Sequence, residues 1–313
     1  MKCIVTGGCG FVGINLTKKL LDLGHEVIVL DNLIVGVLGN LKRVCGNYKN
    51  LTFLEYDLSE ENDDEIFDGC DIIYHLAGMS GVRESIKFPD VWFKNNVIGT
   101  FNVLESARKY SIKNIVMASS SASIGDALPP MHEEMHMKPI SPYGASKGFM
   151  ELYTTAYYHS YGMNVSALRF SNVYGPNSTL KISLVAKFIR KILSNETIHI
   201  YGSGEQTRDF IFVDDLTDAI YLASTKDVGG NIFQISTGVE TSVNEATKII
   251  CEIVRKCGYD VPQIINTEPA LGDIMTNYAT NKKARKLLDW NPKIDIKTGI
   301  EKTVLWFIER EKQ

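Results

Sequence analysis

The stretch TGGCGFVG at residues 6–13 decides the fold of this chain. It follows the run MKCIVT at residues 1–6, which is short, apolar and rich in β-branched side chains, and so predicts a buried strand. Apolar residues at helical spacing come after the glycines and end near Gly24, which predicts a helix. A glycine turn between a strand and a helix is the setting in which this fingerprint predicts a dinucleotide site.

The glycines of this turn suit the binding of phosphate groups. Gly7, Gly10 and Gly13 lack a Cβ, so the backbone can turn tightly, approach a pyrophosphate and pack the helix against the strand. A second strand, HEVIVLDN (25–32), ends in Asp31, about 20 residues further on, where a carboxylate accepts hydrogen bonds from ribose hydroxyls. Since a carboxylate repels a 2′-phosphate, we expect NAD rather than NADP. A glycine-rich turn that binds no ligand is the alternative.

Strands and helices alternate through the first half of the chain. The further strands that we expect are LTFLEYD (51–57), CDIIYHLAG (70–78), KNIVMASSS (113–121) and MNVSALRFSNVYG (163–175), with helices around 92–110 and 145–161. This alternation predicts an α/β fold with a doubly wound parallel sheet of the Rossmann type. The second half is less regular. We predict a dinucleotide-binding domain at 1–172, with returns near 208–237, and a smaller interleaved C-terminal substrate lobe at 173–313.

Composition excludes several classes of function. A net charge of −4 over 313 residues and the lack of a dense basic patch argue against nucleic acid as a partner. No run of about 18 apolar residues predicts a membrane span, and the first strand begins at once, which leaves no room for a signal peptide. The six cysteines are scattered without CxxC spacing, so we expect neither disulfides nor a metal site, and a cytoplasmic location.

Polar residues at strand ends extend the predicted cofactor site. Asp57 and the turn at 75–78 follow strands of the predicted sheet, at the edge where such folds bind ligands, although each could merely end its strand. The complete predicted set of cofactor-binding residues is Gly7, Gly10, Phe11, Val12, Gly13, Asp31, Asn32, Asp57, Leu58, Leu76, Ala77, Gly78, Asn96, Tyr143 and Lys147.

Three residues predict the chemistry. Tyr143 and Lys147 in SPYGASK (141–147) are four residues apart, so on a helix both project from one face. Ser120 lies in VMASSSASIGD (116–126), with Ser121 as the second choice. A phenol has a pKa of about 10, and a nearby ammonium and a cationic nicotinamide should lower it, which favours a general base. The alternative is an ordinary tyrosine and lysine on a surface helix.

The order of many short motifs resembles that of a known family. TGGCGFVG, DNL, HLAG, NNVIGTFNVLESA, ASSSASIG, SPYGASK, LRFSNVYGP, YGSGEQTRDFIFVDD and LLDWNP follow one another nearly end to end. The chain resembles the extended short-chain dehydrogenases/reductases, in particular their nucleotide-sugar epimerases. The resemblance implies an NAD-dependent homodimer whose tyrosine takes a proton from a sugar hydroxyl while the carbon below it gives hydride to NAD. Serine would bind the same sugar oxygen, and lysine would hold the nicotinamide ribose.

The residues beside the catalytic serine narrow the implied reaction. Dehydratases and decarboxylases of the family carry acidic residues there, whereas this chain has Ser121 and Ala122. The hydride should therefore return to the other face of a transient 4-keto sugar, similar to UDP-galactose 4-epimerases. A dehydratase, a reductase, a UDP-glucuronate 4-epimerase and a non-catalytic NAD-binding protein remain alternatives.

The resemblance also implies a set of substrate-binding residues. Asn172 and Arg208 would hold the nucleotide diphosphate of a UDP-sugar, although Arg208 could instead pair with a neighbouring aspartate. Relatives place a second arginine where this chain has Ala270, so Lys181 is a candidate to cover that charge. Asn277 stands where a tyrosine restricts relatives to glucose and galactose, so an N-acetyl group should fit. The predicted substrate-binding residues are Ser120, Tyr143, Asn172, Tyr201, Arg208 and Asn277.

Overall fold

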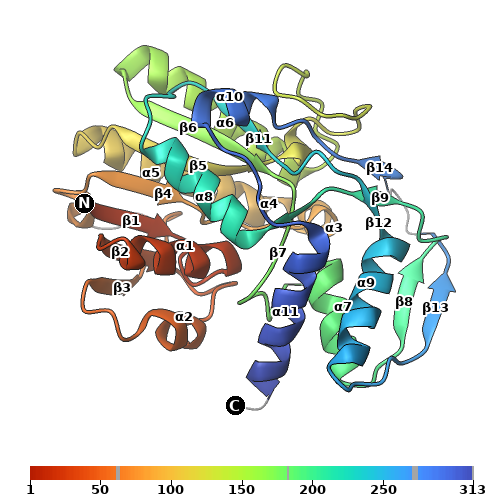
Figure 1. The fold of residues 1–313 in the computed structure, drawn as a ribbon. Coiled ribbons are helices and arrows are strands. Elements are labelled where there is room, and N and C mark those ends of the chain that lie inside the picture. Colours follow the sequence, from red (N-terminus) through yellow and green to blue (C-terminus); the bar gives the residue numbers. More distant parts are fainter. Residues whose placement is uncertain (61–63, 182, 270–273, 312–313) are drawn as a thin grey trace.

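The computed structural model describes residues 1–60, 64–181, 183–269 and 274–311 and is built around a seven-stranded parallel sheet (Figure 1). The strands run in the order β11-β6-β5-β4-β1-β2-β3. The order 3-2-1-4-5-6 within this sheet is that of the doubly wound dinucleotide-binding fold, so the predicted fold class is confirmed. The strands are β1 (Lys2–Thr6), β2 (Glu26–Asp31), β3 (Leu51–Glu55), β4 (Ile72–His75), β5 (Asn114–Ser120), β6 (Asn164–Phe170) and β11 (Ile232–Ile235).

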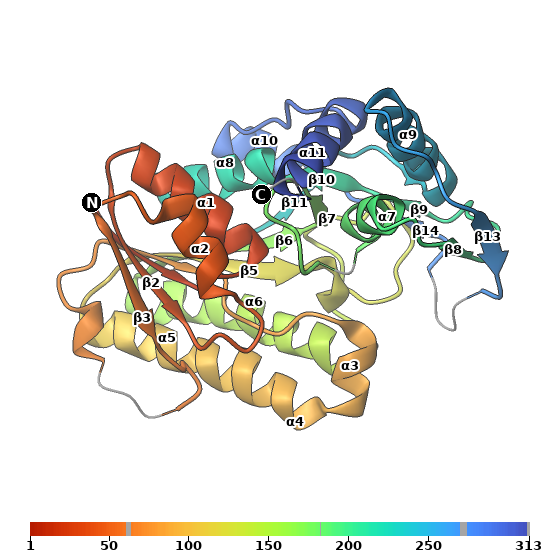
Figure 2. The same cartoon turned by 90° about the horizontal axis from the view of Figure 1, so that it is seen from below.

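Helices cover both faces of this sheet, as Figure 2 shows. Apolar side chains of the strands pack on one face against α1 (Phe11–Asp22), α2 (Leu38–Cys45), α8 (Val213–Ser224) and α10 (Lys282–Leu288). On the other face they pack against α5 (Gly99–Lys109) and α6 (Pro142–Tyr161). Because both faces are covered, the strands are continuous apolar runs rather than alternating ones. Short elements precede these helices or fill turns: η1 (Glu65–Phe67), α3 (Val82–Lys87), α4 (Pro89–Trp92), η2 (Phe93–Ile98) and η3 (Ser121–Ser123).

A second hydrophobic cluster builds a smaller lobe. Its helices are α7 (Leu184–Leu193), α9 (Val243–Lys256) and α11 (Ile296–Glu311), which pack on one another and on short strands. Those strands form three small sheets: β7 (Asn172–Tyr174) with β10 (Phe210–Phe212), β8 (Ile198–Tyr201) with β13 (Ile264–Thr267), and β9 (Thr207–Arg208) between β12 (Thr241–Ser242) and β14 (Thr276–Asn277).

The chain passes between the two clusters more than once. After β7 to β10, helix α8 and strand β11 return to the large sheet, within the predicted range 208–237. Helix α10 also returns, because Ala284, Leu288 and Trp290 belong to the core of the large sheet, where α10 contacts β11 and α8. This later return was not predicted. A division of the chain at residue 172 stays a prediction.

Other features of the described residues bear on the classes of function considered above. No helix within the described ranges is long and apolar enough to span a membrane. All six cysteines are free thiols, and five of them are buried. The described part of the chain also contains no group of three histidine, cysteine or acidic side chains that could hold a metal ion.

Candidate active site

The glycine turn after β1 is packed too tightly for side chains. Gly7 has a φ of +67°, and a Cβ there would lie 2.7 Å from the backbone nitrogen of Ala77. A Cβ on Gly13 would lie 2.2 Å from the carbonyl oxygen of Gly7. Gly10 precedes α1, and no side chain within the described residues caps the first amides of the helix. These amides can therefore bind an anion, so the turn fits the pyrophosphate of a dinucleotide.

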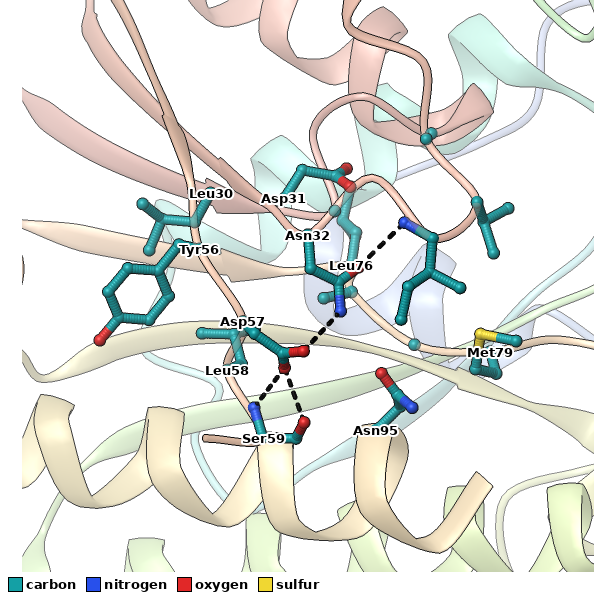
Figure 3. Close-up of a pocket in the computed structure, with 17 residues that line it drawn as sticks. Leu30, Asp31, Asn32, Tyr56, Asp57, Leu58, Ser59, Leu76, Met79 and Asn95 are labelled. Carbon is teal, nitrogen blue, oxygen red and sulfur yellow. Dashed lines mark hydrogen bonds between the residues drawn. The ribbon is translucent and has the colours of Figure 1, made fainter. Parts of the chain in front are cut away.

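A pocket opens at the carboxyl ends of β1, β2, β3 and β4, next to the point where the strand order reverses (Figure 3). Ligands of doubly wound sheets bind at this point. Of the predicted cofactor residues, the pocket is lined by Gly7, Gly10, Asp31, Asn32, Asp57, Leu58, Leu76, Ala77 and Gly78. Phe11, Val12 and Gly13 lie beside it in the first turn of α1. Exposed Ile34 and Val35 also line the pocket.

Two carboxylates in this pocket are fixed by hydrogen bonds. The oxygens of Asp31 accept from the backbone nitrogens of Cys9 and Leu33, both at 2.9 Å. Burial raises the pKa of Asp31 above its ordinary value, and these two bonds oppose the rise. At Asp57 burial also acts to raise the pKa, but hydrogen bonds from Ser59 and Asn32 outweigh it and the pKa is lowered. Figure 3 shows Asp57 turned toward both partners.

The structure separates the roles of two neighbouring asparagines. Asn95 lines the pocket, whereas the predicted Asn96 is 1% exposed and lies behind it. The Asn96 side chain accepts from the nitrogen of Met79 at 2.6 Å and donates to the carbonyl of Met79 at 3.0 Å and to Ser146 Oγ at 2.9 Å. It thus ties the turn after β4 to helix α6. The sequence placed both asparagines side by side on one helix and could not say which one faces the pocket.

Helix α6 starts where its sequence predicts and presents the tyrosine and the lysine together. Ser141 is its N-cap and accepts from the nitrogen of Gly144 at 3.1 Å, and Pro142 occupies the first turn. Tyr143 lies in that first turn and Lys147 one turn later. Lys147 is buried, and its Nζ donates to the carbonyl oxygen of Ala118 on β5 at 2.7 Å. This bond fixes the lysine two residues before Ser120.

Two neighbouring serines at the end of β5 have different partners. Ser120 makes a side-chain hydrogen bond with Tyr143, and its Oγ also accepts from the nitrogen of Ala122 at 3.2 Å. The hydroxyl of Ser121 instead donates to Gln234 Oε1 on β11 at 3.0 Å. This geometry favours Ser120 over Ser121 as the serine that acts with the tyrosine.

Burial dominates the electrostatics of these groups. It raises the pKa of Tyr143, and the hydrogen bond with Ser120 opposes the rise. Burial lowers the pKa of Lys147 to about 8, against an opposing effect of Glu151. Burial, aided by the charge of Lys147, also lowers the pKa of His75 to about 3, so His75 is neutral. The expected fall in the pKa of Tyr143 is therefore not produced by the protein's own groups, because loss of hydration outweighs the hydrogen bond with Ser120.

A buried ion pair supports the catalytic segment from behind, and the sequence reasoning missed it. Glu151 and Arg169 are 0% and 1% exposed, and Arg169 binds both carboxylate oxygens, at 2.8 and 2.7 Å. The hydroxyls of Ser119 and Ser123 donate to Glu151 Oε1 at 2.5 and 2.9 Å. Two signals could have revealed the pair: a glutamate one turn after Lys147 on the same helix face, and an arginine inside an apolar strand.

Short strands of the smaller lobe place Asn172, Arg208 and Asn277, three of the predicted substrate residues, on adjoining strands. Arg208 on β9 and Asn277 on β14 are register partners, and Asn172 on β7 pairs with Phe210, two residues after Arg208. Arg208 Nη1 donates to the carbonyls of Thr207 and Ile274, both at 2.7 Å. Tyr201, at the end of β8, is 44% exposed. Ala270, where the second arginine of relatives was expected, lies outside the described residues.

Comparison with known proteins gives matches over the whole chain. The sequence model of the NAD dependent epimerase/dehydratase family matches residues 3–236. A putative UDP-glucose 4-epimerase of Methanocaldococcus jannaschii is 37% identical over 97% of each chain. A UDP-glucuronate 4-epimerase of Thermodesulfobacterium geofontis is 33% identical over 97% of this chain and 95% of that protein. The solved structure of UDP-N-acetylglucosamine 4-epimerase from Methanobrevibacter ruminantium M1, in complex with UDP-N-acetylmuramic acid, has a TM-score of 0.91 and 30% identity over 99% and 98% of the two chains.

Proposed function

The chain belongs to the NAD dependent epimerase/dehydratase family, and from this premise we propose that it is a UDP-sugar 4-epimerase. Membership of this family confirms three predictions made from the sequence, namely the family resemblance, the enzyme class and NAD as the cofactor. The observation that carries the finer proposal is the meeting of Ser120, Tyr143 and Lys147 at the carboxyl end of β5. Their arrangement suits proton transfer at one sugar hydroxyl.

The protein groups divide the work of this reaction. NAD, when bound, would supply a reversible acceptor for the hydride at C4 of the sugar. The Tyr143 oxygen takes the proton of the 4-hydroxyl and later gives it back, while Ser120 donates a hydrogen bond to the same sugar oxygen. The Lys147 ammonium, held by the carbonyl of Ala118, stabilises the phenolate and holds the nicotinamide ribose. Asp31 selects the unphosphorylated ribose of NAD.

The environment of Ser121 and Ala122 supports epimerisation over elimination. Dehydration needs a further acid and base beside the sugar, but Ala122 has no polar side-chain atom, and the Ser121 hydroxyl is bonded to Gln234. Neither residue could therefore assist the loss of water from the sugar, which supports inversion at C4 as the proposed outcome. The net reaction inverts C4 and leaves NAD oxidised.

The smaller lobe is proposed to hold the nucleotide. Asn172 and Arg208 bind the diphosphate, Tyr201 lies near the base, and Asn277 lies near C2 of the sugar. The register pairing of Arg208 with Asn277 supports this assignment, because it puts the arginine proposed to bind the diphosphate next to the asparagine proposed to contact the sugar. Asparagine is smaller than tyrosine and can hydrogen-bond an amide, so the proposed substrates include UDP-GlcNAc and UDP-GalNAc beside UDP-glucose and UDP-galactose.

We also propose that two copies of the chain pair through α5 and α6. Helices α4 and α5 follow each other end to end through η2, and α6 lies beside them along one outer face of the molecule (Figure 2). Large apolar residues remain exposed there: Phe93 at 57%, Phe101 at 41%, Leu152 at 60% and Tyr161 at 54%. An exposed apolar patch of this kind favours association. Light scattering coupled to size-exclusion chromatography should give the mass of a dimer, and the double change Phe101→Glu with Leu152→Glu should give a monomer.

The function is tested by incubating the purified protein separately with UDP-glucose, UDP-galactose, UDP-GlcNAc, UDP-GalNAc and UDP-glucuronate, with NAD present. Proton NMR should show the C4 epimer of the neutral sugars and no net formation of NADH. Epimerisation of UDP-glucuronate alone would instead support a second candidate function, that of a UDP-glucuronate 4-epimerase. The 33% identity to a UDP-glucuronate 4-epimerase favours this candidate. A stable 4-keto product, or consumption of reduced cofactor, would contradict the proposal in favour of a dehydratase or a reductase.

A further inference from the structure

Lys181 is a partly buried cation that lies against helix α1. Its Nζ lies 5.4 Å from the centre of the Phe11 ring, and Phe11 is the first residue of that helix. Burial lowers the pKa of Lys181 to about 8, and no acidic group opposes this effect. Among the residues that the structure describes, no oxygen accepts a hydrogen bond from this ammonium, and no carboxylate forms an ion pair with it. A contact with an aromatic ring compensates only part of the lost hydration.

The backbone around Lys181 is held firmly. The guanidinium of Arg190 on α7 donates to the carbonyl of Lys181 at 2.7 Å and to that of Thr179 at 2.6 Å. The Ser178 hydroxyl donates to the carbonyl of Gly175 at 2.6 Å. Several bonds thus fix the segment that carries a single uncompensated cation.

The same segment is attached to α1. Asn15, one turn after Phe11, donates to the carbonyl of Pro176 at 3.1 Å and accepts from the side chain of Asn177 at 3.0 Å. These bonds join the smaller lobe to the helix whose N-terminal amides suit phosphate. The Lys181 ammonium is therefore kept beside the first turn of that helix, where an anion is already favoured.

We propose that Lys181 binds a diphosphate beside the first turn of α1. The inference rests on the proposed function, since that function brings two diphosphates to this protein, one in NAD and one in the UDP-sugar. Either would supply the negative charge that this cation lacks. Lys181 would then do what the second arginine does in relatives, from a different segment of the chain.

The test is the affinity of the full-length protein for two diphosphates and for a matched nucleoside. UDP and uridine are titrated calorimetrically into NAD-loaded protein, and NADH is titrated by fluorescence into protein stripped of cofactor. Lys181→Met keeps the length of the side chain and removes its charge. Because a hydrogen bond to a charged group contributes about 1.5–3 kcal/mol, we expect roughly 10- to 100-fold weaker binding of one diphosphate. Lys181→Arg should restore most of it.

Lys302→Met is the control, because Lys302 also lies over an aromatic ring, at 5.6 Å from the centre of Phe212, but is exposed. It should change none of the affinities. Weaker UDP binding with unchanged uridine binding assigns Lys181 to the substrate, and weaker NADH binding assigns it to the cofactor. Unchanged affinities, or equal losses for UDP and uridine, would overturn the inference. If wild-type protein still epimerises a UDP-sugar in that case, the proposed function stands without this residue.

Discussion

The buried pair of Glu151 and Arg169 gives the sharpest test of how the catalytic segment is held. The Glu151 carboxylate accepts hydrogen bonds from both Ser119 and Ser123 and two from Arg169. Glu151→Gln leaves a buried guanidinium without a counter-charge, and Arg169→Met leaves a buried carboxylate. Removing one partner of a buried pair costs about 3–5 kcal/mol, so each single change should lower the free energy of unfolding by that amount.

The double variant Glu151→Gln with Arg169→Met should lose much less than the sum of the two single losses, because it leaves neither the guanidinium nor the carboxylate of this pair buried without its partner. We expect a coupling of at least about 2 kcal/mol. The assay is urea unfolding of NAD-loaded protein, followed by circular dichroism and by tyrosine and tryptophan fluorescence. Lys18→Met is the control, because it breaks an ion pair in which both side chains are nearly half exposed and should cost at most about 1 kcal/mol.

The same variants report on the active site. Ser119 is the neighbour of Ser120, so loosening its bond to Glu151 should lower kcat and leave the KM for the UDP-sugar nearly unchanged. Single changes that cost less than about 1 kcal/mol, or costs that simply add in the double variant, would refute the view that this pair holds the end of β5.

Four further outcomes are expected. Tyr143→Phe should retain NAD and lose turnover by at least about 100-fold, measured by NMR; a near wild-type rate would exclude Tyr143 as the base. Gly13→Ala should purify without NAD, since its Cβ would lie 2.2 Å from a carbonyl oxygen, and normal NAD content would contradict this packing argument. Asn277→Tyr should reduce kcat/KM for UDP-GlcNAc at least about 10-fold relative to UDP-glucose; an unchanged ratio would remove Asn277 from the sugar pocket. Lys181→Met should stabilise NAD-free protein against urea by up to about 3 kcal/mol below pH 8, because the wild-type pKa is lowered to about 8 from 10.5. This gain in stability should shrink as the pH rises from 8 to 10.5, because in that range folded wild-type protein has released the Lys181 proton that the unfolded chain still binds. A gain that does not depend on pH would contradict the assignment of the lowered pKa to Lys181.

The sequence predicted the fold well because local patterns and global topology agree in the first half. A strand, a glycine turn and a helix follow one another at 1–24, and apolar runs recur until β6. In a parallel sheet, the right-handed crossover rule leaves few ways to arrange such units. The return of α10 to the large sheet escaped prediction because this helix and Trp290 contact residues about 50 or more positions earlier, and no local pattern encodes such a contact.

Site residues could be predicted where they belong to a motif with a known chemical role. They could not be predicted where the role of a residue depends on which way its side chain points in the folded protein. Tyr143, Lys147 and Ser120 were predicted from the spacing within short motifs and from the family resemblance of those motifs, and the structure brings the three residues together. The choice between Asn95 and Asn96 depends on the rotation of η2, which a sequence fixes only through packing. The ion pair between Glu151 and Arg169 could not be predicted either, since helix α6 and strand β6, which carry them, meet only in the folded chain.

The pKa values of the catalytic pair show why the cofactor has to take part in making the base. Within the protein, burial raises the pKa of Tyr143 and lowers that of Lys147 to about 8, so both shifts favour the uncharged forms. A general base needs the phenolate, which is favoured only by positive charge brought close to its oxygen. Lys147 offers part of that charge, although its proton is itself weakly held. An oxidised nicotinamide ring is also cationic, so it would supply further positive charge to this site when bound. Tyr143 would then be a stronger acid with the oxidised cofactor in place than in the protein alone, which is the condition under which it has to take up the sugar proton.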